Sequence, residues 1–163
     1  MRQSDDLIRS VSRHTLAYML CSISEMFRHY GEFDPLDLLI VHAILNANVI
    51  HIMNDSELDE RYSSINAIEP DDVKRRVSRA ALARFLHLPL ETVRRRVTRL
   101  KARGVLAEEK PGLIVTQKNV FRFGNNHHLQ TMNIVLVRKL LRDLRRAGVR
   151  GPDDLRGARL QES

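Results

Sequence analysis

The chain has 163 residues, a length typical of one domain or of two small ones. Its composition, 43% hydrophobic and 29% charged, predicts a folded protein and excludes a disordered one, and the scarcity of aromatic residues favours helices. The single cysteine, Cys21, excludes an intrachain disulfide framework and a Cys-rich zinc module. A net charge of +7 is compatible with a polyanionic partner.

The basic excess is confined to one part of the chain. Residues 70–118 contain 13 Lys and Arg against 5 Asp and Glu, a net charge of +8. The other residues contain 14 Lys and Arg against 15 Asp and Glu, a net charge of −1. The positive charge is therefore a local patch and not a general aid to solubility.

Two helices are expected before residue 54. Residues 5–30 carry an apolar stripe at three- and four-residue spacing, with Gly31 as the stop. Asp34 as the cap and Pro35 at the first helical position begin a second helix, which runs to about Met53 and is apolar nearly all round. Such a helix is central to a core or to an interface. The stripe of the first helix consists of Leu16, Met19, Leu20, Ile23, Met26, Phe27 and Tyr30.

The same part of the sequence, before residue 54, indicates where in the cell the protein lies. Asp5 and Asp6 precede the first apolar run, unlike the basic start of a signal peptide. Residues 36–53 approach the length of a membrane span, but Asp37 and several Asn and His residues would lie on several sides of that helix. We interpret this stretch as a buried helix of a soluble, cytoplasmic protein that does not contact a membrane.

The remaining segments outside the basic stretch are a connector, a long helix and a tail. Residues 54–77 are polar and acidic, which predicts a connector with room for one short helix. Residues 125–148 predict a long amphipathic helix that begins at Asn125 or Asn126 and stops at Gly148. Residues 149–163 are expected to be a flexible tail.

The basic stretch contains a helix, a short turn, a second helix and a hairpin, in that order. Ser78 caps the first helix, residues 87–89 form the turn, and the second helix runs over residues 90–103. Runs of strand-like residues at 105–109 and 113–116 complete the pattern. This order is typical of a winged helix-turn-helix. The first helix is expected to bury Ala81, Leu82, Phe85 and Leu86, and the second Val93, Val97 and Leu100.

The outward face of the second helix has the chemistry that reads double-stranded DNA. An α-helix fits the major groove, where an arginine such as Arg95 donates two hydrogen bonds to guanine and a glutamate such as Glu91 accepts from cytosine. Hydroxyls and free backbone N–H groups at helix starts bind phosphate. Arg99 is expected to contact the backbone of any DNA. The wing is acidic, so two roles stay equally open for it: a phosphate contact through its lysine, or a purely structural hairpin. The predicted DNA-binding residues are Ser78, Arg79, Glu91, Thr92, Arg94, Arg95, Arg96, Arg99 and Lys110.

The sequence SRAALARFLHLPLETVRRRVTRLKARGVL resembles the DNA-reading half of bacterial winged-helix transcription regulators of the MarR, GntR and cyclic-AMP-receptor-protein types. Its segment ETVRR is similar to the recognition helix of the cyclic-AMP-receptor type. That resemblance implies that Glu91 and Arg95 touch base edges and that Thr92 lies near a phosphate. Leu90 stands where that family usually has an arginine, so the operator sequence does not carry over. The helices on both sides resemble the MarR arrangement, in which terminal helices build a dimer.

The polar residues of the second helix and the histidines leave alternatives open. A buried amide needs a hydrogen-bonding partner, so Asn46 and Asn48 either fix helix register in a dimer core or, with His42, line a pocket for a small-molecule effector. His42 and His51 are nine residues apart and diverge on one helix, and no metal site, cofactor or catalytic motif is expected. Cys21 is interpreted as a small core residue.

The expected fold is mainly α, a winged helix-turn-helix with a small two-stranded wing, flanked by long N- and C-terminal helices that form a dimerisation core. The expected regions are 1–69 for dimerisation and effector binding, 70–124 for DNA binding, 125–148 for dimerisation and 149–163 for the tail. The expected function is a homodimeric, sequence-specific transcription regulator of a palindromic operator and not an enzyme. The alternatives are a winged-helix protein-interaction module and a sequence-indifferent chromosome-binding protein.

Overall fold

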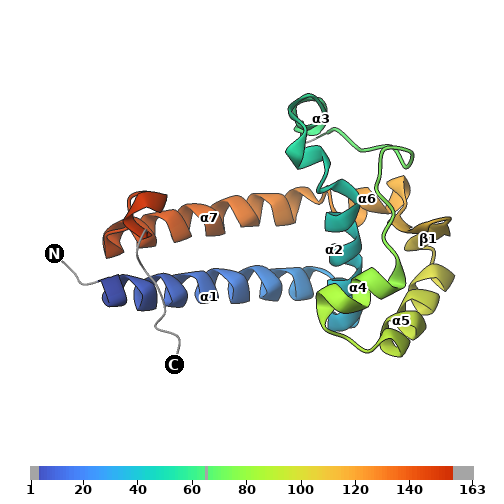
Figure 1. Ribbon diagram of the computed structural model, residues 1–163, viewed down its shortest axis with the longest axis horizontal. Coiled ribbons are helices and arrows are strands. Elements are labelled where there is room, and N and C mark those ends of the chain that lie inside the picture. The colour runs from blue at the N-terminus through green and yellow to red at the C-terminus, as the bar shows by residue number, and fades with distance from the viewer. Residues whose placement is uncertain (1–3, 65, 156–163) are drawn as a thin grey trace. The chain divides into compact units, whose positions relative to one another are not determined.

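The computed structural model describes residues 4–64 and 66–155 and shows a mainly helical protein with one small β-sheet (Figure 1). The chain divides into two compact units. Tyr30–His127 form the winged-helix unit, and Met1–His29 together with His128–Ser163 form the helix-pair unit. This division differs from the expected one, because the apolar second helix folds with the helix-turn-helix and not with a separate region 1–69.

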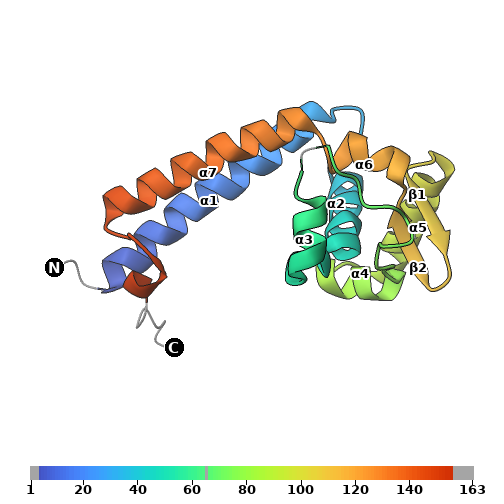
Figure 2. The same cartoon turned by 90° about the horizontal axis from the view of Figure 1, so that it is seen from above.

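The winged-helix unit contains five α-helices, a 3-10 helix and a hairpin among the described residues (Figure 2). The short helix expected in the connector is present as α3. The elements in chain order are α2 (Pro35–Val49), η1 (Ile52–Asn54), α3 (Ser56–Tyr62), α4 (Arg79–Leu86), α5 (Leu90–Ala102), β1 (Leu106–Glu109), β2 (Gly112–Val115) and α6 (Gln117–Phe123).

Helix α2 is the centre of this unit. It begins as predicted, with the Asp34 side chain accepting a hydrogen bond from the Leu36 N–H at 2.8 Å and Pro35 in the first turn. Helices α4, α5 and α6 and strand β2 all contact α2, which explains why it is apolar on several sides. Within the described chain, Pro35–Asn54 is the one stretch long and apolar enough to cross a membrane, and burial in this unit accounts for its hydrophobicity. The fully buried side chains of α2 include Leu38, Ile40, Val41 and Ile44.

The two helices of the helix-turn-helix lie where the sequence predicts them. The Ser78 hydroxyl accepts from the Ala81 N–H at 3.1 Å and caps α4, and His87 then turns the chain in the left-handed conformation, with φ of 52°. The inward face of α5 is confirmed, because Val93, Val97 and Leu100 are fully buried. The predicted burial of Phe85 is wrong. Helix α4 buries Leu82 and Ala83, and Phe85 is 68% exposed.

The wing is an antiparallel pair of short strands. Leu106 lies opposite Val115 and Glu109 opposite Gly112, within a residue or two of the expected boundaries. Val77 extends the sheet, because it exchanges two backbone hydrogen bonds with Leu113, at 3.2 and 2.8 Å. A Cβ atom on Gly112 would lie 2.6 Å from the Val77 carbonyl oxygen, so only glycine allows the chain to pass this closely.

The helix-pair unit consists of α1 (Ser4–His29), α7 (His127–Ala147) and a 3-10 helix, η2 (Pro152–Leu155). Helices α1 and α7 lie side by side and antiparallel (Figures 1 and 2), with Tyr18 donating to the Asn133 side-chain oxygen at 2.8 Å and His29 stacked on His128. The start of the expected tail is ordered, because Val149 is buried and η2 contacts α1. Residues 156–163 of that tail lie outside the described residues.

Candidate DNA-binding surface

Helix α5 presents a polar face opposite its buried side. Glu91, Arg94, Arg95, Thr98 and Arg99 are exposed, as the helical periodicity predicts. Thr92 is half-buried at the first turn. Glu91 and Arg95 therefore lie one turn apart on the exposed face of α5.

Most cations of α5 have an acidic partner within the winged-helix unit. Arg94 lies 3.6 Å from Glu91, and Lys101 Nζ donates to Glu108 at 2.6 Å. Arg96 and Arg99 pair with acids at the start of α2. Among the cations of this helix, all of which the structure describes, Arg95 is the one without an acidic partner.

The predicted role of Arg96 in DNA binding does not fit its surroundings. Its Nη1 donates to Asp34 at 2.5 Å and to Asp37 at 2.9 Å, and only 17% of its side chain is exposed. The hydrogen bond to Asp37 raises the pKa of the Arg96 guanidinium further above its ordinary value. Arg96 therefore joins α5 to α2, and its donors face away from the exposed face of α5.

The start of α4 is tied to the wing. Arg79 hydrogen-bonds both carboxylate oxygens of Glu108, one of them at 2.8 Å, so the predicted phosphate contact of Arg79 would have to compete with this pair. The hydrogen bond from Lys101 and the nearby Arg79 lower the pKa of Glu108 below its ordinary value, while burial opposes them. Glu108 thus carries its charge at neutral pH and links α4, α5 and β1.

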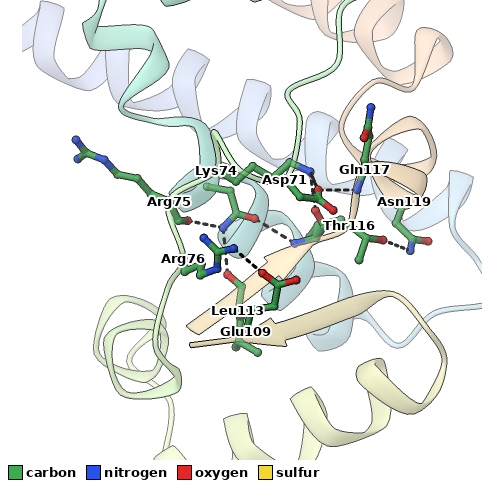
Figure 3. A network of polar contacts seen from close by, with 11 residues as sticks. Asp71, Lys74, Arg75, Arg76, Glu109, Leu113, Thr116, Gln117 and Asn119 are labelled. Atoms are coloured by element: carbon green, nitrogen blue, oxygen red, sulfur yellow. Dashed lines mark hydrogen bonds and ion pairs between the residues drawn. The ribbon is translucent and has the colours of Figure 1, made fainter. Parts of the chain in front are cut away.

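The wing turn offers one cation. Lys110 is exposed and has no acidic partner among the described residues, whereas Glu109 is paired with Arg76 at 2.5 Å. The base of the wing is fixed by Lys74, which is 1% exposed at its side chain. Its Nζ donates to Asp71 at 2.6 Å and to the Val115 carbonyl at 2.9 Å (Figure 3). The wing is therefore a supported hairpin with Lys110 at its tip.

The structure corrects the expected effector pocket, because Asn48 does not share a surface with His42 and Asn46. Asn48 is fully buried and donates to the Arg75 and Leu113 carbonyls at 2.6 and 3.2 Å, while its side-chain oxygen accepts from the Val115 N–H at 3.1 Å. Asn46 is exposed. Burial lowers the pKa of His42, and one of its ring nitrogens lies 2.8 Å from the Leu38 carbonyl.

Asn48 therefore has its partners within one chain and does not need a dimer core to satisfy its amide. It attaches α2 to β2 and to residue 75.

Cys21, expected in the core, is exposed on α1. Within the described residues, no group of three or more His, Cys, Asp and Glu could hold a metal ion.

Two exposed cations near this surface were not singled out in the sequence. Arg84 is exposed in the last turn of α4, and Figure 3 shows the Arg75 guanidinium pointing away from the polar network at the base of the wing. Neither has an acidic partner among the described residues. The one feature of the sequence that could have indicated Arg75 and Arg84 as DNA-binding candidates is their position inside the basic stretch 70–118.

The comparison with protein families supports this surface. Residues 76–106 match the family described as "Bacterial regulatory proteins, crp family", over α4, α5 and the start of β1. No curated protein and no solved structure gives a significant match to the chain. The family match supports a bacterial helix-turn-helix regulator that binds DNA.

Proposed function

We propose that the protein is a cytoplasmic, sequence-specific transcription regulator that binds a palindromic operator as a homodimer and reads the major groove with α5. The observation that carries the proposal is the exposed face of α5, where Glu91 and Arg95 stand one turn apart on a helix whose other side is fully buried. An arginine without an intramolecular carboxylate can donate both of its hydrogen bonds to a guanine edge. Lys110 would add a phosphate contact from the wing.

The proposed homodimer is supported by the apolar surface of the helix-pair unit. Leu16, Met19 and Leu20 on α1 share one helix face and are exposed. Helix α7 exposes Ile134 and Leu141, two turns apart, and the neighbouring Val135. Exposed apolar stripes on two long helices are typical of an interface, and a second copy of this pair would complete a four-helix bundle.

A dimer of this kind explains a palindromic site. Two copies of α5 related by a two-fold axis would enter successive major grooves about 34 Å apart. The helices on both sides of the DNA-reading segment resemble the MarR arrangement, so the proposal assigns α1 and α7 to dimerisation. A small-molecule effector is not part of the proposal, because Asn48, one of the three residues expected to line its pocket, is fully buried against residue 75 and β2.

The test is selection of bound sequences from a library of randomised DNA duplexes at two salt concentrations, with the chain and its Arg95→Ala variant. We expect the parent chain to enrich a two-fold symmetric motif and the variant to lose the preference at one base pair of each half-site. Salt-sensitive binding without any motif would instead indicate a sequence-indifferent DNA-binding protein. Absence of binding at both salt concentrations would contradict the proposal and favour the protein-interaction module.

A further inference from the structure

Four charged side chains form a neutral cluster along one edge of α5, where it meets the start of α2. Arg96 and Arg99 come from α5, and Asp34 and Asp37 come from the cap and first turn of α2. Asp37 is central, because one carboxylate oxygen accepts from Arg96 at 2.9 Å and the other accepts from Arg99 at 2.6 Å. The two acids and two bases cancel in charge.

The two arginines differ in what the cluster does to them. Arg96 is mostly buried and shared by both acids, so it is a structural link between the helices. Arg99 keeps 53% of its side chain exposed while its guanidinium is held by a carboxylate that is 2% exposed. Because residues four apart are neighbours on a helix surface, Arg99 lies next to Arg95 on the face that would meet DNA.

A phosphate that approaches Arg99 must therefore compete with Asp37. A charge-assisted hydrogen bond to a carboxylate with so little access to water is stronger than the same bond in solvent. Phosphate contacts supply affinity for any DNA sequence, whereas contacts to base edges supply preference. Holding Arg99 away from phosphate removes a contribution that all sequences would share and leaves that of Arg95.

We infer that Asp37 is a positioning residue that sets the sequence-independent affinity of the DNA-binding surface, by holding Arg99 and so limiting its contact with phosphate. The inference rests on the proposed function, since it concerns the same surface. On this inference, Asp37 controls how tightly random sequences are bound, although it is a buried acid of α2 that does not itself face DNA.

The test compares binding of the chain and its Asp37→Asn variant to a pool of random-sequence duplexes over a range of salt concentrations. The amide keeps the shape of the side chain but releases the charge of Arg99. We expect the variant to bind random duplexes several-fold more tightly, with a slope of log affinity against log salt steeper by about 0.9, the value for one additional phosphate contact. Its affinity for the selected motif should rise by the same factor, so the ratio of the two affinities should stay that of the parent.

Two further variants separate this role from a purely structural one. Asp34→Asn removes an acid that pairs with Arg96 only and keeps an effective helix cap, so it should bind random duplexes as the parent does. Asp37→Asn combined with Arg99→Gln should return both the affinity and the salt slope to the parent values, because the gain acts through Arg99. A gain that persists in the double variant would overturn the inference.

A variant that does not depend on the folding of Asp37→Asn gives a second test. In the parent background, Arg99→Gln should change the affinity for random duplexes less than Lys110→Gln does, because Lys110 has no acidic partner. Equal losses would overturn the inference, as would an unchanged salt slope in a folded Asp37→Asn variant. If the parent chain binds no DNA, the proposed function fails together with the inference, whereas failure of these variants alone leaves the proposed function intact.

Discussion

In the winged-helix unit, α2 buries Leu38, Ile40 and Ile44 completely, whereas in the helix-pair unit α1 leaves Leu16, Met19 and Leu20 exposed. Among the residues of α1 and α7 whose burial is described, Ala147 alone is buried. Helix α2 is apolar nearly all round, whereas α1 and α7 are amphipathic. The difference is that four elements enclose α2, while α1 has one long helix and a 3-10 turn against it.

The two units leave different kinds of side chain exposed. The winged-helix unit buries its apolar core and pairs most cations of α5, and the exposed cations that it leaves without an acidic partner among the described residues include Arg95, Lys110, Arg75 and Arg84. The helix-pair unit leaves apolar side chains free, which need another surface to leave water. One unit is therefore suited to a polyanion, and the proposed function pairs the other with a second copy of itself.

The largest effect should come from opening the core of the winged-helix unit. Leu38→Ala removes a fully buried side chain from α2 and is expected to lower the free energy of unfolding by about 3 kcal/mol. Leu39→Ala is the matched control, because Leu39 is the next residue of the same helix but is exposed, and it should cost less than about 1 kcal/mol. Urea unfolding followed by circular dichroism measures both. Equal losses would show that α2 is not packed as the structure has it.

The next effect concerns the charge that this unit leaves free. Arg95→Ala should reduce discrimination between the selected motif and a single-base mismatch by about 2 kcal/mol, since a bidentate contact to guanine is lost. Lys110→Ala should weaken binding to both duplexes equally and reduce the salt slope by about 0.9. Competition titrations against matched and mismatched duplexes measure the discrimination between sequences and the affinity common to both duplexes separately. If Lys110→Ala altered the mismatch ratio, the wing would read bases and not phosphate.

A smaller effect tests the apolar surface of the helix-pair unit. Met19→Glu places a charge in the proposed dimer interface and should weaken self-association about tenfold, or 1.4 kcal/mol. Met53→Glu is the matched control, because Met53 is also exposed, 67% against 54% for Met19, but lies in the winged-helix unit. Sedimentation equilibrium of the two variants compares them directly. If Met53→Glu weakened self-association and Met19→Glu did not, dimerisation would belong to the winged-helix unit and the proposed interface would be wrong.

The fold was predictable to the extent that its signals are local. Three such signals are the Asp34-Pro35 start of α2, the Val93, Val97 and Leu100 spacing of α5 and the strand-like runs of the hairpin. Each lies within one element, and each predicted its element correctly. Phe85 was misplaced because α4 is short, so the alternative face containing Ala83 fitted its apolar residues equally well.

The site was less predictable because its pairs are distant in sequence. Arg96 and Arg99 meet acids that lie 59 to 62 residues earlier, and Arg79 meets a wing glutamate 29 residues later. No helical periodicity carries that information. Arg95 could be identified from its position on the helix, whereas the neutralisation of its neighbours required the tertiary structure. The same holds for Asn48, whose partners are 27 to 67 residues away.

The smallest effect is the pH dependence of the link between α4, α5 and the wing. Because its pKa is lowered in the folded state, Glu108 stabilises the fold above its unfolded pKa of about 4.5, and this contribution is lost as the pH falls through the lower folded value. Glu108→Gln should therefore destabilise the protein at neutral pH, by less than about 1 kcal/mol because the carboxylate is partly exposed. The difference between parent and variant should disappear below the folded pKa. Urea unfolding at neutral and acidic pH measures it, and a difference that persists in acid would show that the glutamate stabilises the winged-helix unit by packing and not by its charge.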